Sequence, residues 1–146
     1  MNDNELIWES YQNMGIHIND KLQDFTGQII RGEKTIETKF KPTLNQYVGK
    51  RVGIIKTGTS KKVKPAKSYL VGSAVIGDPV IYHNQEEFDK DYDKHLVDKN
   101  SKFYIKDGKV KYGYPLLNVK KIEPVELVLT DRKGWTPTSR RIDYDL

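Results

Sequence analysis

The chain has 146 residues, no cysteine and a formal net charge of +5. One domain of this size buries about 68–70% of its unfolded surface, so a single hydrophobic core is expected. The missing cysteines exclude disulfides and thiolate nucleophiles or metal sites, and a polar N-terminus without a long apolar run predicts a cytoplasmic protein without a membrane span.

Two helices are predicted first along the chain. Residues 2–14 place a stripe of large apolar side chains at helical spacing, and the stripe ends near Gly15. Residues 19–31 carry a second stripe, formed by Leu22, Phe25 and Ile29. Gly32 follows as the left-handed residue that ends this helix.

Short strands follow the helices. Alternation and β-branched runs predict strands at 35–40, 52–56, 69–76 and 80–82, with a bulge at Gly72. An acidic helix is predicted over 85–96, with Phe88, Tyr92 and Leu96 facing inward. Asp107-Gly108 predicts a tight hairpin between strands 103–106 and 109–112. Residues 119–122 and 125–130 predict final strands with a bend at Pro124.

This order of elements predicts an α+β fold. Regular alternation of strand and helix is missing, so we expect a mainly antiparallel, curled sheet or small barrel with flanking helices. We divide the chain into an N-terminal helical extension (1–17), a domain (18–130) and a C-terminal tail (131–146). We expect the tail either to dock through Trp135 or to stay mobile, and it is the candidate segment for a protein contact.

The segment 32–39, Gly-Glu-Lys-Thr-Ile-Glu-Thr-Lys, is the main candidate for a site. An extended strand places Lys34, Glu37 and Lys39 within about 20 Å. A carboxylate between two ammonium groups is favoured in its charged form and can present donors and an acceptor to a polar ligand. A surface strand with alternating charges, or a structural ion pair, is the alternative.

Three segments resemble the ASCH domain of the PUA-like superfamily. Residues 29–39 are similar to the Gly-x-Lys-x-x-Glu-x-Arg signature of that family, with Lys39 in the place of the arginine. Residues 48–54 resemble a glycine-containing strand of the family. Residues 111–119, with 122–125, resemble its late aromatic segment and final strand. Together the three segments cover about residues 18–129.

The resemblance implies a PUA-like β-barrel whose cleft binds RNA or a nucleotide derivative. Some small members of the family hydrolyse acetylated cytidine or cut RNA. In the deacetylating members a threonine nucleophile lies three positions after the lysine, and here that position is Glu37. Lys39 in place of arginine also removes a forked donor. Both departures favour binding over acyl chemistry.

The resemblance and the charges together give an expected mode of binding. The basic stretch 50–67 predicts phosphate contacts through Arg51, Lys61, Lys62 and Lys64, unless its loop is only solvated. Tyr112 and Tyr114 lie at i, i+2 and would stack on bases, unless they face the core. We therefore expect single-stranded or looped RNA, or a nucleotide derivative, as the partner.

A hydrolase acting on a modified nucleoside, or a ribonuclease, is the alternative. In such an enzyme Lys34 and Glu37 would be catalytic. The histidines are isolated and no Walker loop is present, so neither a metal nor another cofactor is expected.

Overall fold

The computed structural model describes residues 15–20, 22–57, 68–128 and 136–137. Its elements are β1 (Gly15–Asn19), α2 (Phe25–Ile30), β2 (Ile36–Lys39), a 3₁₀ turn (Asn45–Tyr47), β3 (Arg51–Thr57), β4 (Ser68–Ile76), β5 (Val80–Tyr82), α3 (Gln85–Lys90), α4 (Tyr92–His95), β6 (Lys111–Val128) and β7 (Thr136–Pro137). The predicted helix over 2–14, the loop with Lys61, Lys62 and Lys64, and Trp135 lie outside the described residues. So the sequence-based expectations for them stay predictions.

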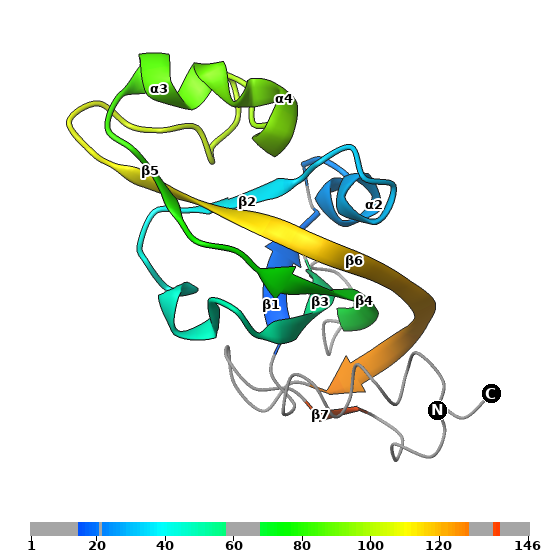
Figure 1. Cartoon of the computed structure of the whole chain (residues 1–146). Coiled ribbons are helices and arrows are strands. Elements are labelled where there is room, and N and C mark those ends of the chain that lie inside the picture. The colour runs from blue at the N-terminus through cyan, green and yellow to red at the C-terminus, as the bar shows by residue number, and fades with distance from the viewer. Residues whose placement is uncertain (1–14, 21, 58–67, 129–135, 138–146) are drawn as a thin grey trace.

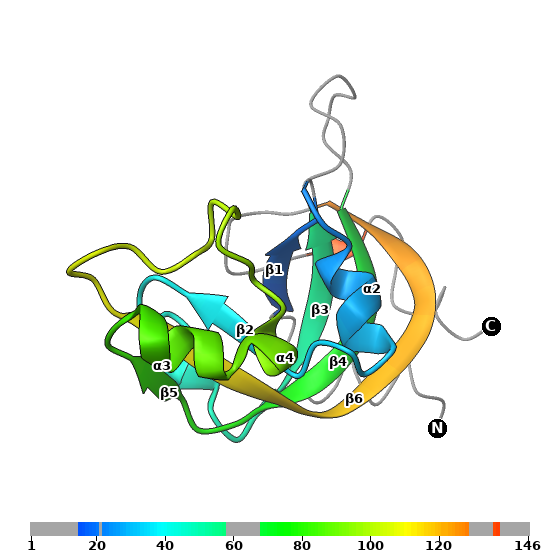
Figure 2. The same ribbon diagram turned by 90° about the horizontal axis from the view of Figure 1, so that it is seen from above.

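The strands form one curled, mostly antiparallel sheet with the order β1-β3-β4-β6-β2 (Figures 1 and 2). β5 and β7 also pair with β6, and only β1 with β3 is a parallel pair among the named strands. The architecture is a half-barrel with short helices, which confirms the predicted fold class. β1 spans the boundary proposed between residues 17 and 18, so residues 15–17 pack as part of the sheet.

β6 is a long strand that belongs to both parts of the sheet, one formed with β2 and β5 and the other with β4 (Figure 1). Its first residues pair with β2 on one side and β5 on the other, and its later residues pair with β4. The register with β4 shifts twice, once next to Gly72, as predicted, and once opposite Asn118, whose φ is 48°. These irregularities let one strand curl without a break at Pro124.

The helix α2 is shorter than predicted. It begins after Asp24, whose carboxylate accepts a hydrogen bond from the Gly27 amide, and Gly32 follows it with a φ of 79°. Leu22 precedes the helix and is 62% exposed, so its assignment to the apolar stripe was wrong. Asp20 instead anchors the first turn, because its carboxylate accepts hydrogen bonds from the amide and hydroxyl of Thr26.

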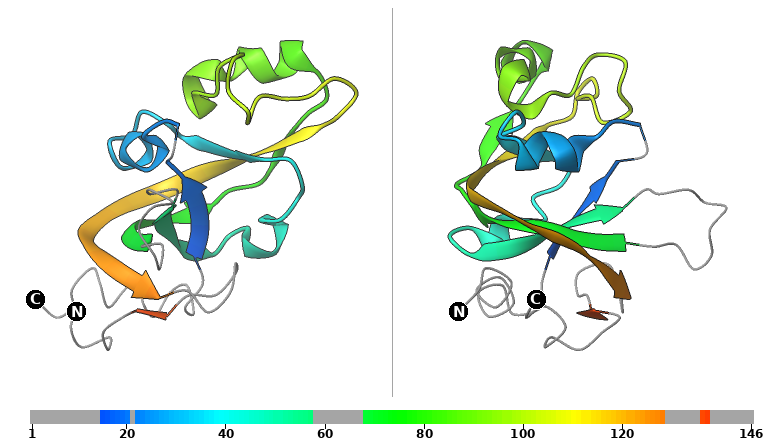
Figure 3. Two further views of the ribbon diagram at one scale, coloured as in Figure 1. Left: turned by 180° about the vertical axis from the view of Figure 1, so that it is seen from behind. Right: turned by 90° about the vertical axis from the view of Figure 1, so that its right-hand side faces the viewer.

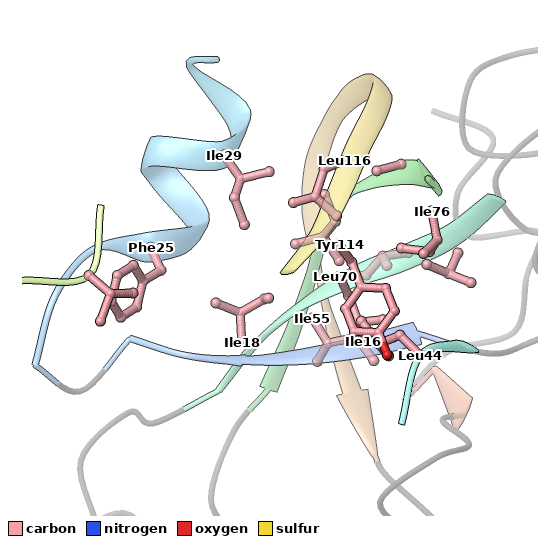
Figure 4. Close-up of a cluster of buried hydrophobic side chains, with 14 of the residues drawn as sticks. Ile16, Ile18, Phe25, Ile29, Leu44, Ile55, Leu70, Ile76, Tyr114 and Leu116 are labelled. Carbon is pink, nitrogen blue, oxygen red and sulfur yellow. The ribbon is translucent and has the colours of Figure 1, made fainter. Parts of the chain in front are cut away.

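The core lies inside the curl of the sheet, under α2 (Figure 4). Phe25 and Ile29 of the helix face Ile18 of β1 and Leu116 of β6, and all four are at most 6% exposed. The strands β3 and β4 supply most of the remaining aliphatic side chains. The burial of α2 against β1 and β6 therefore fixes the segment that follows the helix.

Two predictions between β5 and β6 need correction. The acidic helix forms and buries Phe88 as predicted, but it is divided into α3 and α4, and His95 faces inward while Tyr92 is 46% exposed. Residues 103–106 do not form a strand, so the predicted hairpin is absent. Gly108 has a φ of 70°, and the amide of Lys109 donates to Lys106. The turn therefore forms, but Phe103 and Ile105 pack inward as loop residues.

β1 and β2 are the two ends of the strand order, and no ladder joins them. A side chain crosses between them instead, because the ammonium of Lys39 donates to the carbonyl of His17 at 3.2 Å. Two further views show α2 and the segment between α4 and β6 at one end of the sheet and the last residues of β6 at the other (Figure 3). Within the described residues, no helix is long and apolar enough to span a membrane.

Candidate ligand-binding cavity

A cavity of about 160 Å³ lies where β1, β2, α2 and the segment 97–111 meet. Its polar lining comes mainly from β1, β2 and the first residue of β6, and its apolar lining comes from α2 and the loops. The lining residues are His17, Ile18, Asn19, Phe25, Lys34, Glu37, Thr38, Lys39, Phe40, Val97, Phe103 and Lys111. Apolar walls around a few convergent polar groups are typical of small-molecule sites.

Lys34 is placed by the turn after α2. Its backbone amide donates to the carbonyl of Gln28, and the next amide, that of Thr35, donates to Lys94 in α4. The side chain is 1% exposed, and its ammonium donates to the carbonyl of His95 and lies 4.7 Å from the centre of the Phe25 ring. Burial lowers the pKa of Lys34, while the nearby Glu37 carboxylate opposes that shift.

Glu37 lies between two ammonium groups at the edge of β2. Its carboxylate oxygens are 3.7 Å from the Lys34 nitrogen and 3.5 Å from the Lys39 nitrogen. One oxygen also accepts a hydrogen bond from the backbone amide of Thr38. The Glu37 residue is 8% exposed, whereas the Lys39 side chain is 27% exposed. The carboxylate is thus held inside the cavity, and Lys39 extends toward its mouth.

Lys111 approaches the cavity from the first position of β6. It is 1% exposed, and its ammonium donates to the carbonyl of Phe103. The nitrogen lies 4.2 Å from the ring centre of Phe40 and within 6.0 Å of those of Phe88 and Phe103. Burial lowers the pKa of Lys111 to about 7, and Glu37 opposes this shift while Lys34 adds to it.

His95 supports both the cavity wall and Lys34. Its Nδ1 accepts from the amide of Val97, so its Nε2 carries the hydrogen that is donated to the carbonyl of Phe88 at 2.7 Å. The imidazole also stacks on the Phe88 ring at 3.9 Å. Burial lowers the pKa of His95, which keeps the ring neutral in this arrangement.

A larger groove adjoins the cavity. Its volume is about 730 Å³, and it shares His17, Asn19 and Lys39 with the inner cavity. The side chains that line only the groove include four polar, uncharged ones, Thr43, Gln46, Tyr47 and Thr57, beside the apolar Ile16 and Leu44. Past Lys39, the inner cavity therefore continues into a groove that offers hydroxyl and amide groups among apolar side chains.

Comparison with known proteins identifies the fold. No family model matches the chain, and no curated protein is significantly similar to it. Solved structures of ASCH from Zymomonas mobilis do match. The unmodified protein aligns with a TM-score of 0.58 and 17% identity over 76% of this chain and 71% of its own. A mutant form aligns with a TM-score of 0.59 and 14% identity over 90% of this chain and 94% of its own. The chain has the ASCH fold.

In this ASCH fold, the predicted signature residues come together. Lys34, Glu37 and Lys39 all line the cavity. Arg51 does not, because its guanidinium donates to the hydroxyl of Ser73 at 2.8 Å and to the carbonyl of Asn118 at 2.9 Å. It thereby ties β3 to β4 and to the bend in β6.

The two tyrosines of the ASCH-like aromatic segment lie elsewhere. Tyr114 is 0% exposed, and its hydroxyl donates to the side chain of Asn45 at 2.6 Å (Figure 4). It therefore belongs to the core and offers no ring face for stacking, which corrects the expectation for this residue. Tyr112 is partly buried against the core and does not line the cavity.

Sequence reasoning missed Lys111 and the phenylalanines of the cavity. Lys39 pairs with Tyr112, so Lys111 follows in register next to Phe40. The neighbouring lysine in the same ASCH-like segment, rather than the tyrosines, is the residue that reaches the cavity. Phe103 could not be placed, because the predicted hairpin would have put it in a strand.

Proposed function

We propose that this domain binds a nucleobase in the cavity, as part of a nucleoside or of single-stranded or looped RNA. The observation that carries the proposal is the combination of three phenylalanine rings with the Lys34–Glu37–Lys39 arrangement in one cavity. An aromatic wall favours a planar ring, and stacking of a base is worth about 1–3 kcal/mol. Glu37 supplies an acceptor for a base amine, while the lysines supply donors.

The size of the cavity supports a base rather than a whole nucleotide. Drug-sized ligands fill pockets of about 300–1,000 Å³, and this cavity measures about 160 Å³. The sugar would then lie in the adjoining groove, where Thr43 and Gln46 offer partners for hydroxyl groups. Lys39 lines both compartments, so it is the residue that would contact the ligand at the junction.

Hydrolysis of a modified nucleoside in the same cavity is the second candidate function. The observation that favours it is the position of Thr38. This residue carries a hydroxyl group and lines the cavity together with Lys34 and Glu37. In this alternative Thr38 would be the nucleophile, even though it follows Glu37 rather than taking its place. Binding remains the first candidate. A threonine nucleophile needs a neighbouring group that accepts its proton, and the described hydrogen bonds include none between the Thr38 hydroxyl and such a group.

The test is a titration of cytidine and of a short single-stranded RNA into the wild type and Glu37→Gln. The variant keeps the size of the side chain but loses the charged acceptor, so cytidine should bind about 10-fold or more weakly. Glu123→Gln, at an exposed position on β6, is the matched control and should bind as the wild type does. Equal cytidine affinity in all three proteins would overturn the proposal. Incubation with N4-acetylcytidine tests the second candidate, since time-dependent release of acetate that is lost in Thr38→Val would support hydrolysis.

A further inference from the structure

The charges around the cavity do not balance. Three lysines, Lys34, Lys39 and Lys111, line it together with a single carboxylate, that of Glu37. Two of those lysines are 1% exposed, so water screens their charges poorly. Buried charges are normally paired, because leaving water costs an ion several kcal/mol unless a partner compensates.

Glu37 is already shared by two of the lysines. Its carboxylate contacts Lys34 at 3.7 Å and Lys39 at 3.5 Å, and it receives the Thr38 amide as well. Lys111 is different, since its polar contact is a neutral carbonyl, that of Phe103. Within the described part of the chain, no carboxylate forms an ion pair with Lys111, and three aromatic rings surround it instead.

We propose that Lys111 is the binding site for an acidic group on the ligand, so that the cavity selects a planar ring that carries a carboxylate or an equivalent oxyanion. With the anion bound, two acidic groups would face the three lysines of the cavity, and Lys111 would have an ionic partner of its own. The rings of Phe40 and Phe103 would flank the planar ligand. This inference rests on the proposed function, because it identifies which base derivatives the same cavity prefers.

The proposal predicts proton uptake on binding. The charged and titratable groups near Lys111 are Glu37, which favours its protonation, and Lys34, Lys39, Lys106 and the neutral His95, which do not. Because the pKa of free Lys111 is about 7, a bound anion would raise it and recruit a proton at higher pH. Affinity for the acidic ligand should therefore fall as the pH rises from about 6.5 to 8.5, whereas affinity for a neutral base should change little.

The experiment compares uracil with its 5-carboxy and 6-carboxy derivatives by isothermal titration calorimetry. At pH 7, at least one carboxylated ring should bind about 10-fold or more tightly than uracil. Titration in buffers of different ionisation enthalpy should show proton uptake that increases toward pH 8.5. Lys111→Met should abolish both the preference and the uptake. Lys109→Met, at an exposed loop lysine, is the control and should retain them.

The outcomes separate this inference from the proposed function. Equal affinity for uracil and both carboxylated rings, together with normal cytidine binding, would overturn the acidic-group site and leave base binding in place. A carboxylate preference that survives in Lys111→Met would also overturn it. Lys111-dependent binding of a carboxylated ring without any binding of uracil or cytidine would support the anion site and overturn the proposal that the cavity binds an unmodified base. Thermal unfolding of each variant confirms that it is folded.

Discussion

At the scale of single residues, the cavity is built from buried lysines that would be more stable in water. Lys34 is compensated by a carbonyl, a ring and the Glu37 carboxylate. Among the described contacts, Lys111 is compensated by the Phe103 carbonyl and by aromatic rings, and Glu37 favours its charged form without forming an ion pair with it. Titratable groups that lie in a cavity and whose pKa is strongly shifted by burial are enriched at functional sites. This burial supports the proposal that the cavity binds a ligand.

The residue-scale prediction concerns the pH dependence of stability. The pKa of Lys111 is about 7 in the folded state and about 10.4 when unfolded. Between these pH values the unfolded chain binds up to one more proton than the folded protein. The cost of burying the charged Lys111 lowers the free energy of unfolding below pH 7, and this cost disappears as the pH rises. The wild type should gain up to about 1 kcal/mol per pH unit relative to Lys111→Met between pH 7 and 9.5. Urea unfolding at several pH values measures this gain, and parallel profiles would contradict it.

At the scale of the elements, the curl of the sheet depends on close contact between β4 and β6. At Gly72 a side-chain carbon would lie 2.4 Å from the backbone oxygen of Lys120 and 2.7 Å from a methyl group of Ile30. The same position coincides with a shift of register between the strands. Glycine is required here because β6 and α2 both approach the backbone of β4, and not because of its φ angle.

Substitution of this glycine provides the element-scale prediction. In Gly72→Ala the new methyl group meets a backbone atom that cannot rotate away, so the strands must separate. We expect the free energy of unfolding to fall by about 1–3 kcal/mol, as in other overpacked cores. Chemical denaturation measures the loss. Lys50→Ala, at an exposed residue before β3, should stay within about 0.5 kcal/mol of the wild type. An unchanged midpoint for Gly72→Ala would contradict the proposed role of the contact.

At the scale of the whole molecule, the barrel is incomplete and the cavity occupies its opening. β1 and β2 end the strand order without pairing with each other. Lys39 spans that opening through its hydrogen bond to His17 and its ion pair with Glu37. A ladder between β1 and β2 would fill this space with backbone, so the incomplete closure leaves room for the cavity.

The molecule-scale prediction tests this bridge. Lys39→Met removes the hydrogen bond across the opening, and we expect a loss of stability of about 0.5–1.5 kcal/mol. Hydrogen exchange should accelerate in β1 more than in β4, because β1 pairs only with β3 among the named strands. Lys109→Met, at an exposed loop position, is the control and should leave both rates unchanged. Equal acceleration in both strands would show that Lys39 stabilises the fold globally rather than at the opening.

The sequence by itself determined four of the strands and part of the cavity, whereas β1 was not predicted and β6 was predicted as separate shorter strands. Local alternation placed β2, β3, β4 and β5 closely, because a strand with one buried face needs apolar residues at every second position. The turn after α2 and the strand that follows it also depend on neighbouring residues. For this reason the sequence could identify Lys34 and Glu37 as candidate site residues. The ASCH-like motif then gave the correct fold.

Only the tertiary structure decided which side chains face the cavity. Tyr112 and Lys111 are adjacent in β6, and their positions follow from the register with β2, which no local pattern specifies. Tyr114 lies in the core, on the inner face of the curled strand β6. Phe103 lines the cavity from a loop, although the Asp-Gly pair had predicted a hairpin strand there. Local sequence patterns predict which side chains of a strand share a face of the sheet. The closure of the sheet, made by contacts between residues far apart in the chain, determines where those residues meet.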